Sequence, residues 1–237
     1  MTDPTQAEIS AEIAAASAVP GHPRLDYPPY RSSLLRHPHH ALVAVDPEAA
    51  ELAAPVFGTR DVAAGESDLT AGWAGDPIGE RMTITGRVLD AHGRPVAGQL
   101  VEIWQANAAG RYRHAGDRHP APLDPNFSGT GRCLTGSAGD YTFTTVKPGP
   151  YPWRNHRNAW RPAHIHFSLF GTAFTERLVT QMYFPGDPLI PLDPILSSVT
   201  DATARALLIA TYDHDRSVPE TSTGYRWDIV LGRTWAQ

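Results

Sequence analysis

The stretch "PGPYPWRNHRNAWRPAHIHFSLF", Pro148–Phe170, ends in a phrase where imidazole and apolar side chains alternate. If this phrase forms a strand, His164 and His166 project from one face, because side chains point alternately to the two faces of a strand. Ile165 and Phe167 then project from the opposite face. Two imidazoles on one strand face commonly supply two ligands to a metal ion, although surface or hydrogen-bonded histidines give the same pattern.

Short strand patterns occupy most of the chain after Ile78. They are "RMTITGRVLD", "GQLVEIWQAN", "DYTFTTV", "AHIHFSLF", "RLVTQMYF" and "YRWDIVLG", and Gly- and Pro-rich segments separate them. One helical pattern lies at about residues 201–212. Many short strands with little helix predict a mainly β fold, with a β-sandwich core and a few short helices.

The chain before this strand-rich part has a different character. Residues 6–18 predict a short Ala-rich helix, since isoleucines four positions apart form a weak apolar stripe. Proline-rich, irregular sequence follows as far as about Gly79, and so long an irregular segment is typical of a packed arm or an interaction surface. We therefore expect an N-terminal helix and extended arm over residues 1–78 and a β-sandwich domain over residues 79–237.

Composition restricts the class of protein. A chain of 237 residues, 41% of them hydrophobic, can bury a sizeable core. The formal net charge of −5 comes from 20 basic and 25 acidic residues without long single-sign runs, which argues against nucleic acid or an anionic membrane as partner. Cys133 is the single cysteine, so an intrachain disulfide is excluded and a thiolate zinc site disfavoured. With no export signal and no membrane-span pattern, we expect a cytoplasmic protein.

Further metal ligands must come from oxygen donors. A third ligand of an iron(II) or zinc site would usually be a carboxylate, and Asp140, Glu176 and Asp187 are the nearest candidates. Tyr112 in "GRYRH" and Tyr151 in "PGPYPW" lie in polar, Pro- or Arg-containing loops, where each could also simply pack. A phenolate ligand requires a strong Lewis acid such as iron(III), because the phenol otherwise keeps its proton at neutral pH.

Several phrases in a fixed order carry a family resemblance. They are "ITGRVLDAHGRPVAGQLVEIWQANAAGRYRH", "APLDPNF", "GRCLT", "KPGPYPWRN", "WRPAHIHF", "TQMYF" and "GDPLIP". Together they resemble the intradiol ring-cleaving dioxygenases, and within them the β subunits of protocatechuate 3,4-dioxygenases. The resemblance runs from about Tyr27 to Gly232 and leaves the first 26 residues uncovered.

The resemblance implies a non-haem iron(III) centre. Its ligands fall on Tyr112, Tyr151, His164 and His166. The implied fold is a transthyretin-like or immunoglobulin-like β-sandwich, in agreement with the strand patterns. The implied reaction, part of aromatic catabolism (the β-ketoadipate pathway), cleaves protocatechuate, 3,4-dihydroxybenzoate, with dioxygen to give 3-carboxy-cis,cis-muconate. In the family, the tyrosine at the position of Tyr151 leaves the iron and accepts a proton when the catechol binds.

The same resemblance implies roles for neighbouring residues. Arg161 corresponds to an active-site arginine whose charge favours electron density on the bound ring. Gln181 corresponds to a glutamine close to that arginine, Trp153 to a wall of the pocket, and Tyr30 to a tyrosine that helps to hold the substrate carboxylate. Each of these side chains could instead have a packing or surface role.

The resemblance also implies a partner. Protocatechuate dioxygenases are hetero-oligomers of related α and β chains that share the active site, with the iron ligands on β, and the irregular arm would suit packing on an α subunit. Two other classes of function stay open. One is an iron(II) oxygenase that uses His164, His166 and a carboxylate. The other is a noncatalytic sandwich subunit that only binds.

Overall fold

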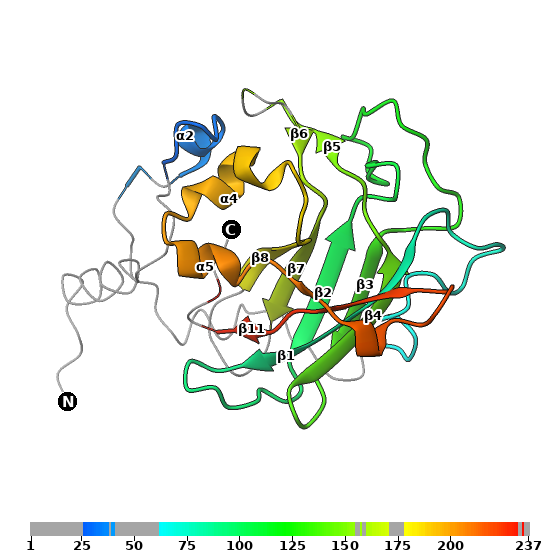
Figure 1. Cartoon of the computed structure of the whole chain (residues 1–237). Helices are drawn as coiled ribbons and strands as arrows, with labels where there is room; N and C mark the ends of the chain where they lie inside the picture. The colour runs from blue at the N-terminus through cyan, green and yellow to red at the C-terminus, as the bar shows by residue number, and fades with distance from the viewer. Residues whose placement is uncertain are drawn as a thin grey trace.

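The computed structural model describes residues 26–37, 39–40, 62–154, 157, 160–170, 178–231 and 234 (Figure 1). Its strands are β1 (Arg81–Leu89), β2 (Leu100–Gln105), β3 (Thr130–Leu134), β4 (Asp140–Val146), β5 (Tyr151–Pro152), β6 (Trp160–Arg161), β7 (His164–Phe170), β8 (Leu178–Tyr183), β9 (Thr211–Tyr212), β10 (Thr223–Arg226) and β11 (Ile229–Val230). Its helices are α2 (Ser33–Arg36), α4 (Pro194–Ser198) and α5 (Ala202–Ala206), with 3₁₀ turns η2 (Ile190–Leu192) and η3 (His214–Arg216).

The strands form two main sheets. One is antiparallel throughout, in the order β3-β2-β7-β8. In the other, β1 pairs with antiparallel β4 on one side and with parallel β10 and β11 on the other, and β9 extends the sheet beyond β10. A two-stranded ribbon, β5-β6, stands apart. Strand β7 is thus an interior strand, hydrogen-bonded by β2 and β8 on its two sides.

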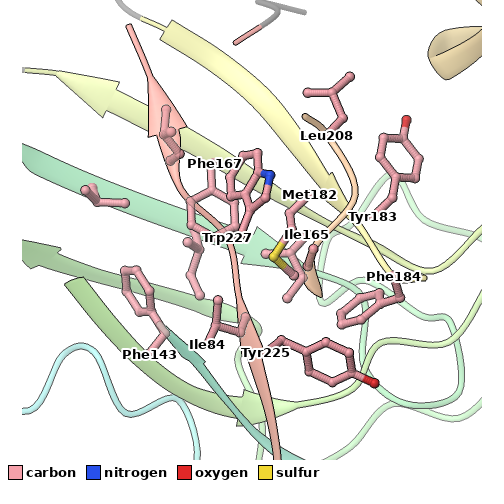
Figure 2. Packing of buried hydrophobic residues seen from close by; sticks show 14 of the residues in the cluster. Ile84, Phe143, Ile165, Phe167, Met182, Tyr183, Phe184, Leu208, Tyr225 and Trp227 are labelled. Carbon is pink, nitrogen blue, oxygen red and sulfur yellow. The ribbon is translucent and has the colours of Figure 1, made fainter. Parts of the chain in front are cut away.

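The core lies between the two sheets. Figure 2 shows Phe167 of β7 among Phe143 of β4, Trp227 and Ile165. The Phe167 ring centroid lies 6.2 Å from that of Phe143 and 4.8 Å from that of Trp227. Side chains of both sheets therefore interdigitate in one buried layer, and the predicted β-sandwich is confirmed.

Residues 62–78 contact both sheets. Leu69 is buried in the core, and its backbone N–H donates to Thr144 O of β4 at 2.9 Å. Glu66 forms an ion pair with Arg132 of β3. The division of the chain at residue 78 stays a prediction, and the helix predicted over residues 6–18 lies outside the described residues.

The helix predicted over residues 201–212 was wrong beyond residue 206. Asp201 caps α5 by accepting a hydrogen bond from Ala204 N at 2.8 Å, but the chain then leaves the helix. Leu208 O accepts from Tyr183 N at 2.8 Å, and Leu208 is fully buried, so pairing with β8 and core burial override helix propensity. Figure 1 shows α4 and α5 together beside β8. No helix in the described ranges is both long and apolar enough to cross a membrane.

Two further strand predictions need correction. The single strand expected over residues 225–232 is two strands, β10 and β11, because Arg87 N of β1 bonds the Asp228 side chain at 3.0 Å instead of a backbone carbonyl. Strand β3 was not predicted, since "TGRCL" lacks a clear alternation of apolar and polar residues. It forms at the edge of its sheet through pairing with β2.

Cys133 of β3 should be unreactive in the folded protein. Burial raises the pKa of its thiol to about 12, although a hydrogen bond from the Thr142 backbone acts in the opposite direction. Because the thiolate is the nucleophile, we expect iodoacetamide at pH 8 to alkylate the native chain at least about a hundredfold more slowly than the urea-unfolded chain. Intact mass followed over time measures both rates. Equal rates would contradict the expectation.

Candidate metal centre

The two histidines of β7 lie on the outer face of the four-stranded sheet, opposite the core. The strand register gives His166 two cross-strand neighbours on this face, Trp104 of β2 and Gln181 of β8. His164 has Tyr183 as its neighbour on β8. The Trp104 and His166 rings stack, with centroids 4.7 Å apart and planes inclined by 3°. The face predicted to carry both imidazoles is therefore a continuous row of aromatic and polar side chains.

His164 has the tautomer that a metal ligand needs. Its Nδ1 lies 2.8 Å from the Pro162 carbonyl oxygen, which can only accept, so Nδ1 carries the proton and Nε2 keeps a lone pair. Burial, and then the charges of Arg161 and His166, hold the pKa of His164 well below its usual value, which keeps the ring neutral at pH 7. In this structure Nε2 accepts a hydrogen bond from Arg161 Nη1 at 3.1 Å.

Tyr112 comes from the loop between β2 and β3. Its backbone N–H donates to Asp117 Oδ2 at 2.7 Å, and the preceding Arg111 N–H donates to Asn107 Oδ1 at 2.9 Å. The Tyr112 hydroxyl is buried and makes no hydrogen bond of regular geometry among the described residues, although it has a weaker contact with Tyr151. Burial, followed by the neighbouring Tyr151, raises the pKa of Tyr112 well above its usual value. The phenol therefore stays protonated unless a strong Lewis acid binds its oxygen.

Tyr151 of β5 completes the cluster. Its ring is edge-on to that of Tyr112, with centroids 5.2 Å apart, and its centroid lies 5.4 Å from that of His164. The Tyr151 hydroxyl lies 3.5 Å from His164 Nε2. The His164 and His166 ring centroids are 4.9 Å apart. The structure thus brings together all four side chains expected to bind iron, and we call these four residues the candidate metal centre.

Two glycines allow the tyrosine-bearing loops to meet. Gly110 has a φ of 77°, and a Cβ there would lie 2.1 Å from the Pro150 carbonyl oxygen. Gly110 N and Gly149 N both donate to the Asn107 carbonyl oxygen, at 2.9 and 3.0 Å. The two backbones therefore touch with no side chain between them, which places the two phenol rings side by side.

The donor set fits a ferric ion. Two imidazole nitrogens and two phenol oxygens are ligands that stabilise iron(III), provided that the phenols ionise. The buried Tyr112 hydroxyl is the observation that fits a metal most directly. A bound cation would give this oxygen a ligand bond and displace its proton, which removes the cost of burying it without a regular hydrogen bond.

Two of the three carboxylates considered as alternative ligands are engaged elsewhere or lie apart. Asp187 accepts hydrogen bonds from Ala163 N and Leu189 N, both at 2.9 Å. Asp140 begins β4 in the other sheet, and Glu176 lies outside the described residues. Within the described ranges, no group of three or more His, Cys, Asp or Glu side chains could hold a metal ion.

Arg161 lies beneath the candidate metal centre, with only 1% of its surface exposed. Its Nη2 donates to Gln181 Oε1 at 2.6 Å and to Tyr183 Oη at 2.9 Å. Asp193 binds the guanidinium through both carboxylate oxygens, at 2.8 Å from Nη2 and 3.2 Å from Nε. Burial alone would lower the pKa of Arg161, but Tyr183 and Asp193 raise it well above its usual value, so the group is charged.

The family resemblance predicts Arg161 and Gln181 beside the metal, but it does not predict two of their partners, Tyr183 and Asp193. Tyr183 could have been found, because it lies two positions after Gln181 and so shares its face of β8. Asp193 precedes Pro194 in an N-cap pattern, a signal that indicates a helix start but not a contact with Arg161.

The two residues expected to contact substrate lie together beside Arg161. The Tyr30 and Trp153 ring centroids are 4.9 Å apart, and the guanidinium carbon of Arg161 lies 5.4 Å from the Trp153 ring centroid. A cavity of about 390 Å³ also reaches the cluster, and its lining includes Tyr112 and His166. The arm residue Tyr30 therefore contributes to the surroundings of the site despite its distance in sequence.

Comparisons with known proteins show which family the chain belongs to. A family model described as Dioxygenase matches residues 52–233, and one for the N-terminal part of protocatechuate 3,4-dioxygenase β subunits matches residues 17–48. A protocatechuate 3,4-dioxygenase β chain from Burkholderia cepacia is 53% identical over 214 residues, which are 90% of this chain and 91% of that one. The chain belongs to the intradiol dioxygenase family.

Other intradiol dioxygenases are more distant. A protocatechuate 3,4-dioxygenase α chain from Pseudomonas putida is 33% identical over 158 residues, 66% of this chain and 73% of that one. The crystal structure of 3-chlorocatechol 1,2-dioxygenase from Rhodococcus opacus 1CP has the same fold, with a TM-score of 0.55, 24% identity, and coverage of 74% of this chain and 67% of that one. The likeness to β subunits is confirmed, and it begins at residue 17 rather than at Tyr27.

Gly110→Ala should lower the iron content of this intradiol dioxygenase without unfolding the sandwich. The added Cβ would collide with the Pro150 carbonyl oxygen and force the two tyrosine loops apart. Gly93→Ala is the matched control, since Gly93 has a similar φ of 81° but open space around its Cβ position. Both variants carry the strain of a positive φ, about 1–2 kcal/mol. Iron per chain and far-UV circular dichroism measure the outcome, and equal iron loading in the two variants would contradict it.

Proposed function

We propose that this chain catalyses iron(III)-dependent intradiol cleavage of protocatechuate by dioxygen to 3-carboxy-cis,cis-muconate. The observation that carries the proposal is the buried Tyr112 hydroxyl, which makes no regular hydrogen bond among the described residues, close to Tyr151 and to two histidines on one strand face. The 53% identity to a protocatechuate 3,4-dioxygenase β chain supports the choice of substrate.

The residues that would hold the iron are Tyr112, Tyr151, His164 and His166. The chemistry that iron(III) would supply there is a Lewis-acid site to which a catechol can bind through both oxygens and so become reactive toward dioxygen. The protein contributes neutral imidazoles, with the proton of His164 fixed on Nδ1 by Pro162 O. The phenols contribute negative charge once they are ionised.

Tyr151 would also act as a proton acceptor. A catechol must lose protons to bind through both oxygens, and a phenolate that leaves the metal can take up one of them. In this structure the Tyr151 hydroxyl has Arg161 Nη1 at 3.4 Å and His164 Nε2 at 3.5 Å, so it has polar neighbours when it is protonated. Arg161 would favour negative charge that develops on the bound ring.

Tyr30 and Trp153 would bind the substrate. Their rings are in tilted contact beside Arg161, and the Tyr30 hydroxyl is a suitable donor to an aromatic carboxylate. Gln181 would help to hold Arg161 through its contact with Nη2.

We also propose an α subunit as partner. A protocatechuate 3,4-dioxygenase α chain is among the relatives, and the name of the B. cepacia relative identifies it as a β chain. The arm over residues 1–78 would pack on that subunit, and the sandwich over residues 79–237 would carry the iron. A cytoplasmic location is part of this proposal, supported by the single cysteine.

Tyr112→Phe, His164→Ala and His166→Ala should each lower iron content and abolish ring cleavage, because each removes a ligand. Tyr212→Phe, at an exposed position in β9, is the control and should bind iron normally. Metal analysis and visible absorption test this prediction. The iron-loaded wild-type protein should be red-brown from phenolate-to-iron(III) charge transfer, whereas an iron(II) oxygenase or a noncatalytic subunit should be almost colourless. Full iron and unchanged turnover in any one ligand variant would remove that residue from the ligand set.

Tyr151→Phe should keep much of its iron but bind and turn over substrate slowly. Three protein ligands remain and solvent can fill the gap, yet phenylalanine cannot accept a proton from the catechol. Stopped-flow absorbance of anaerobic protocatechuate binding, followed by single-turnover oxygen addition, separates the two steps. Wild-type rates for both would show that Tyr151 only packs.

A further inference from the structure

Asp193 is a fully buried carboxylate at the start of α4. It is 0% exposed, and its backbone lies on the segment that follows the short turn η2. As the N-cap of α4, it receives a hydrogen bond from Ile195 N at 3.3 Å, which is long for a cap. Its shorter contacts, at 2.8 Å, are with Arg161 Nη2 and Tyr183 Oη. The side chain is thus directed mainly at the arginine rather than at its own helix.

The contact fixes the plane of the Arg161 guanidinium. Asp193 binds Nε and Nη2 with its two oxygens, which is the two-point geometry that a carboxylate forms with arginine. Because the guanidinium is rigid and planar, holding these two nitrogens also determines where Nη1 points. Nη1 is the nitrogen that reaches His164 Nε2 and the Tyr151 hydroxyl, at 3.1 and 3.4 Å.

The charges of Arg161 and Asp193 also indicate that Asp193 acts on the arginine. Arg161 and Asp193 are both almost completely excluded from solvent, and a buried charge without a partner is unfavourable. Gln181 and Tyr183 supply oxygens to Nη2 but carry no charge. Among the described residues that contact the guanidinium, Asp193 is therefore the anion that compensates it.

We propose that Asp193 is a positioning residue that orients Arg161 toward the metal ligands and balances its charge beside them. Tyr183 supports this arrangement, since its hydroxyl lies 2.8 Å from Asp193 Oδ2 and 2.7 Å from Gln181 Oε1 and can donate its one proton to either oxygen. The proposal rests on the proposed function, because it assigns Asp193 a part in the same reaction. A carboxylate that only caps α4 would instead affect stability alone.

The test compares Asp193→Asn with Asp124→Asn. Asp124 is also buried, at 5% exposure, and accepts backbone hydrogen bonds from Ile78 N and Asn126 N at 2.7 and 2.8 Å, away from the candidate metal centre. Each substitution keeps the shape of the side chain and removes its charge. Urea unfolding of the metal-free proteins measures the structural effect of each. Iron content, the visible absorption band, kcat and KM are then measured on the iron-loaded proteins.

Asp193→Asn should lower kcat roughly 10–100-fold with little change in KM, and should shift the phenolate-to-iron(III) band. Asp124→Asn should lose stability but keep the wild-type band and kcat. Wild-type kcat and band position in Asp193→Asn would overturn the proposal. A wild-type protein that is colourless and inactive when iron-loaded would overturn the proposed function itself, and this inference with it.

A double variant shows whether Asp193 acts through Arg161. Asp193→Asn/Arg161→Gln removes both charges, so it can fold even if Asp193→Asn alone cannot. If Asp193 acts through the arginine, the double variant should match Arg161→Gln in iron content, band position and anaerobic protocatechuate affinity. A double variant that differs severalfold from Arg161→Gln in these measurements would show an independent role and overturn the proposal.

Discussion

The alternation of side chains along β7 is the constraint on which the rest of the structure depends. The side chains of Ile165 and Phe167 point into the core, and those of His164 and His166 lie on the opposite face of the same strand. Pairing with β2 and β8 on both sides prevents this strand from slipping, because a shift of one residue would exchange the two faces. The same hydrophobic burial that stabilises the sandwich therefore also determines the spacing of the two imidazoles.

The other half of the candidate metal centre depends on contacts outside the two main sheets. Tyr112 and Tyr151 meet because the backbones around Gly110 and Gly149 touch, and Asn107 O joins them. Next to these rings, Arg161 is hydrogen-bonded to the buried side chains of Gln181, Tyr183 and Asp193. Sheet pairing thus holds the histidine side of the centre, and close packing of the backbone holds the tyrosine side.

Sequence patterns predicted the features of this structure that depend on residues close together in the chain. The strands β1, β4 and β7 follow from alternation, and so does the shared face of the two histidines. The residues alone left open whether tyrosines or carboxylates join them, because loop packing is not visible in a pattern; the family resemblance supplied the tyrosines. The helix predicted over residues 201–212 ends at residue 206 because burial of Leu208 beside β8 outweighs local preference. Asp193 was missed because its partner Arg161 lies 32 positions away, and no local pattern indicates a contact at that separation.

The prolines around Tyr151 have a consequence for the unfolded chain. Pro148, Pro150 and Pro152 each fix φ near −65°, so this segment has few conformations to lose when the protein folds. Where the native backbone accepts proline without strain, each one stabilises by about 0.4–1 kcal/mol through the unfolded state. The segment that carries Tyr151 is thus ordered partly by its own covalent structure. Its backbone can stay in place while the phenol ring rotates.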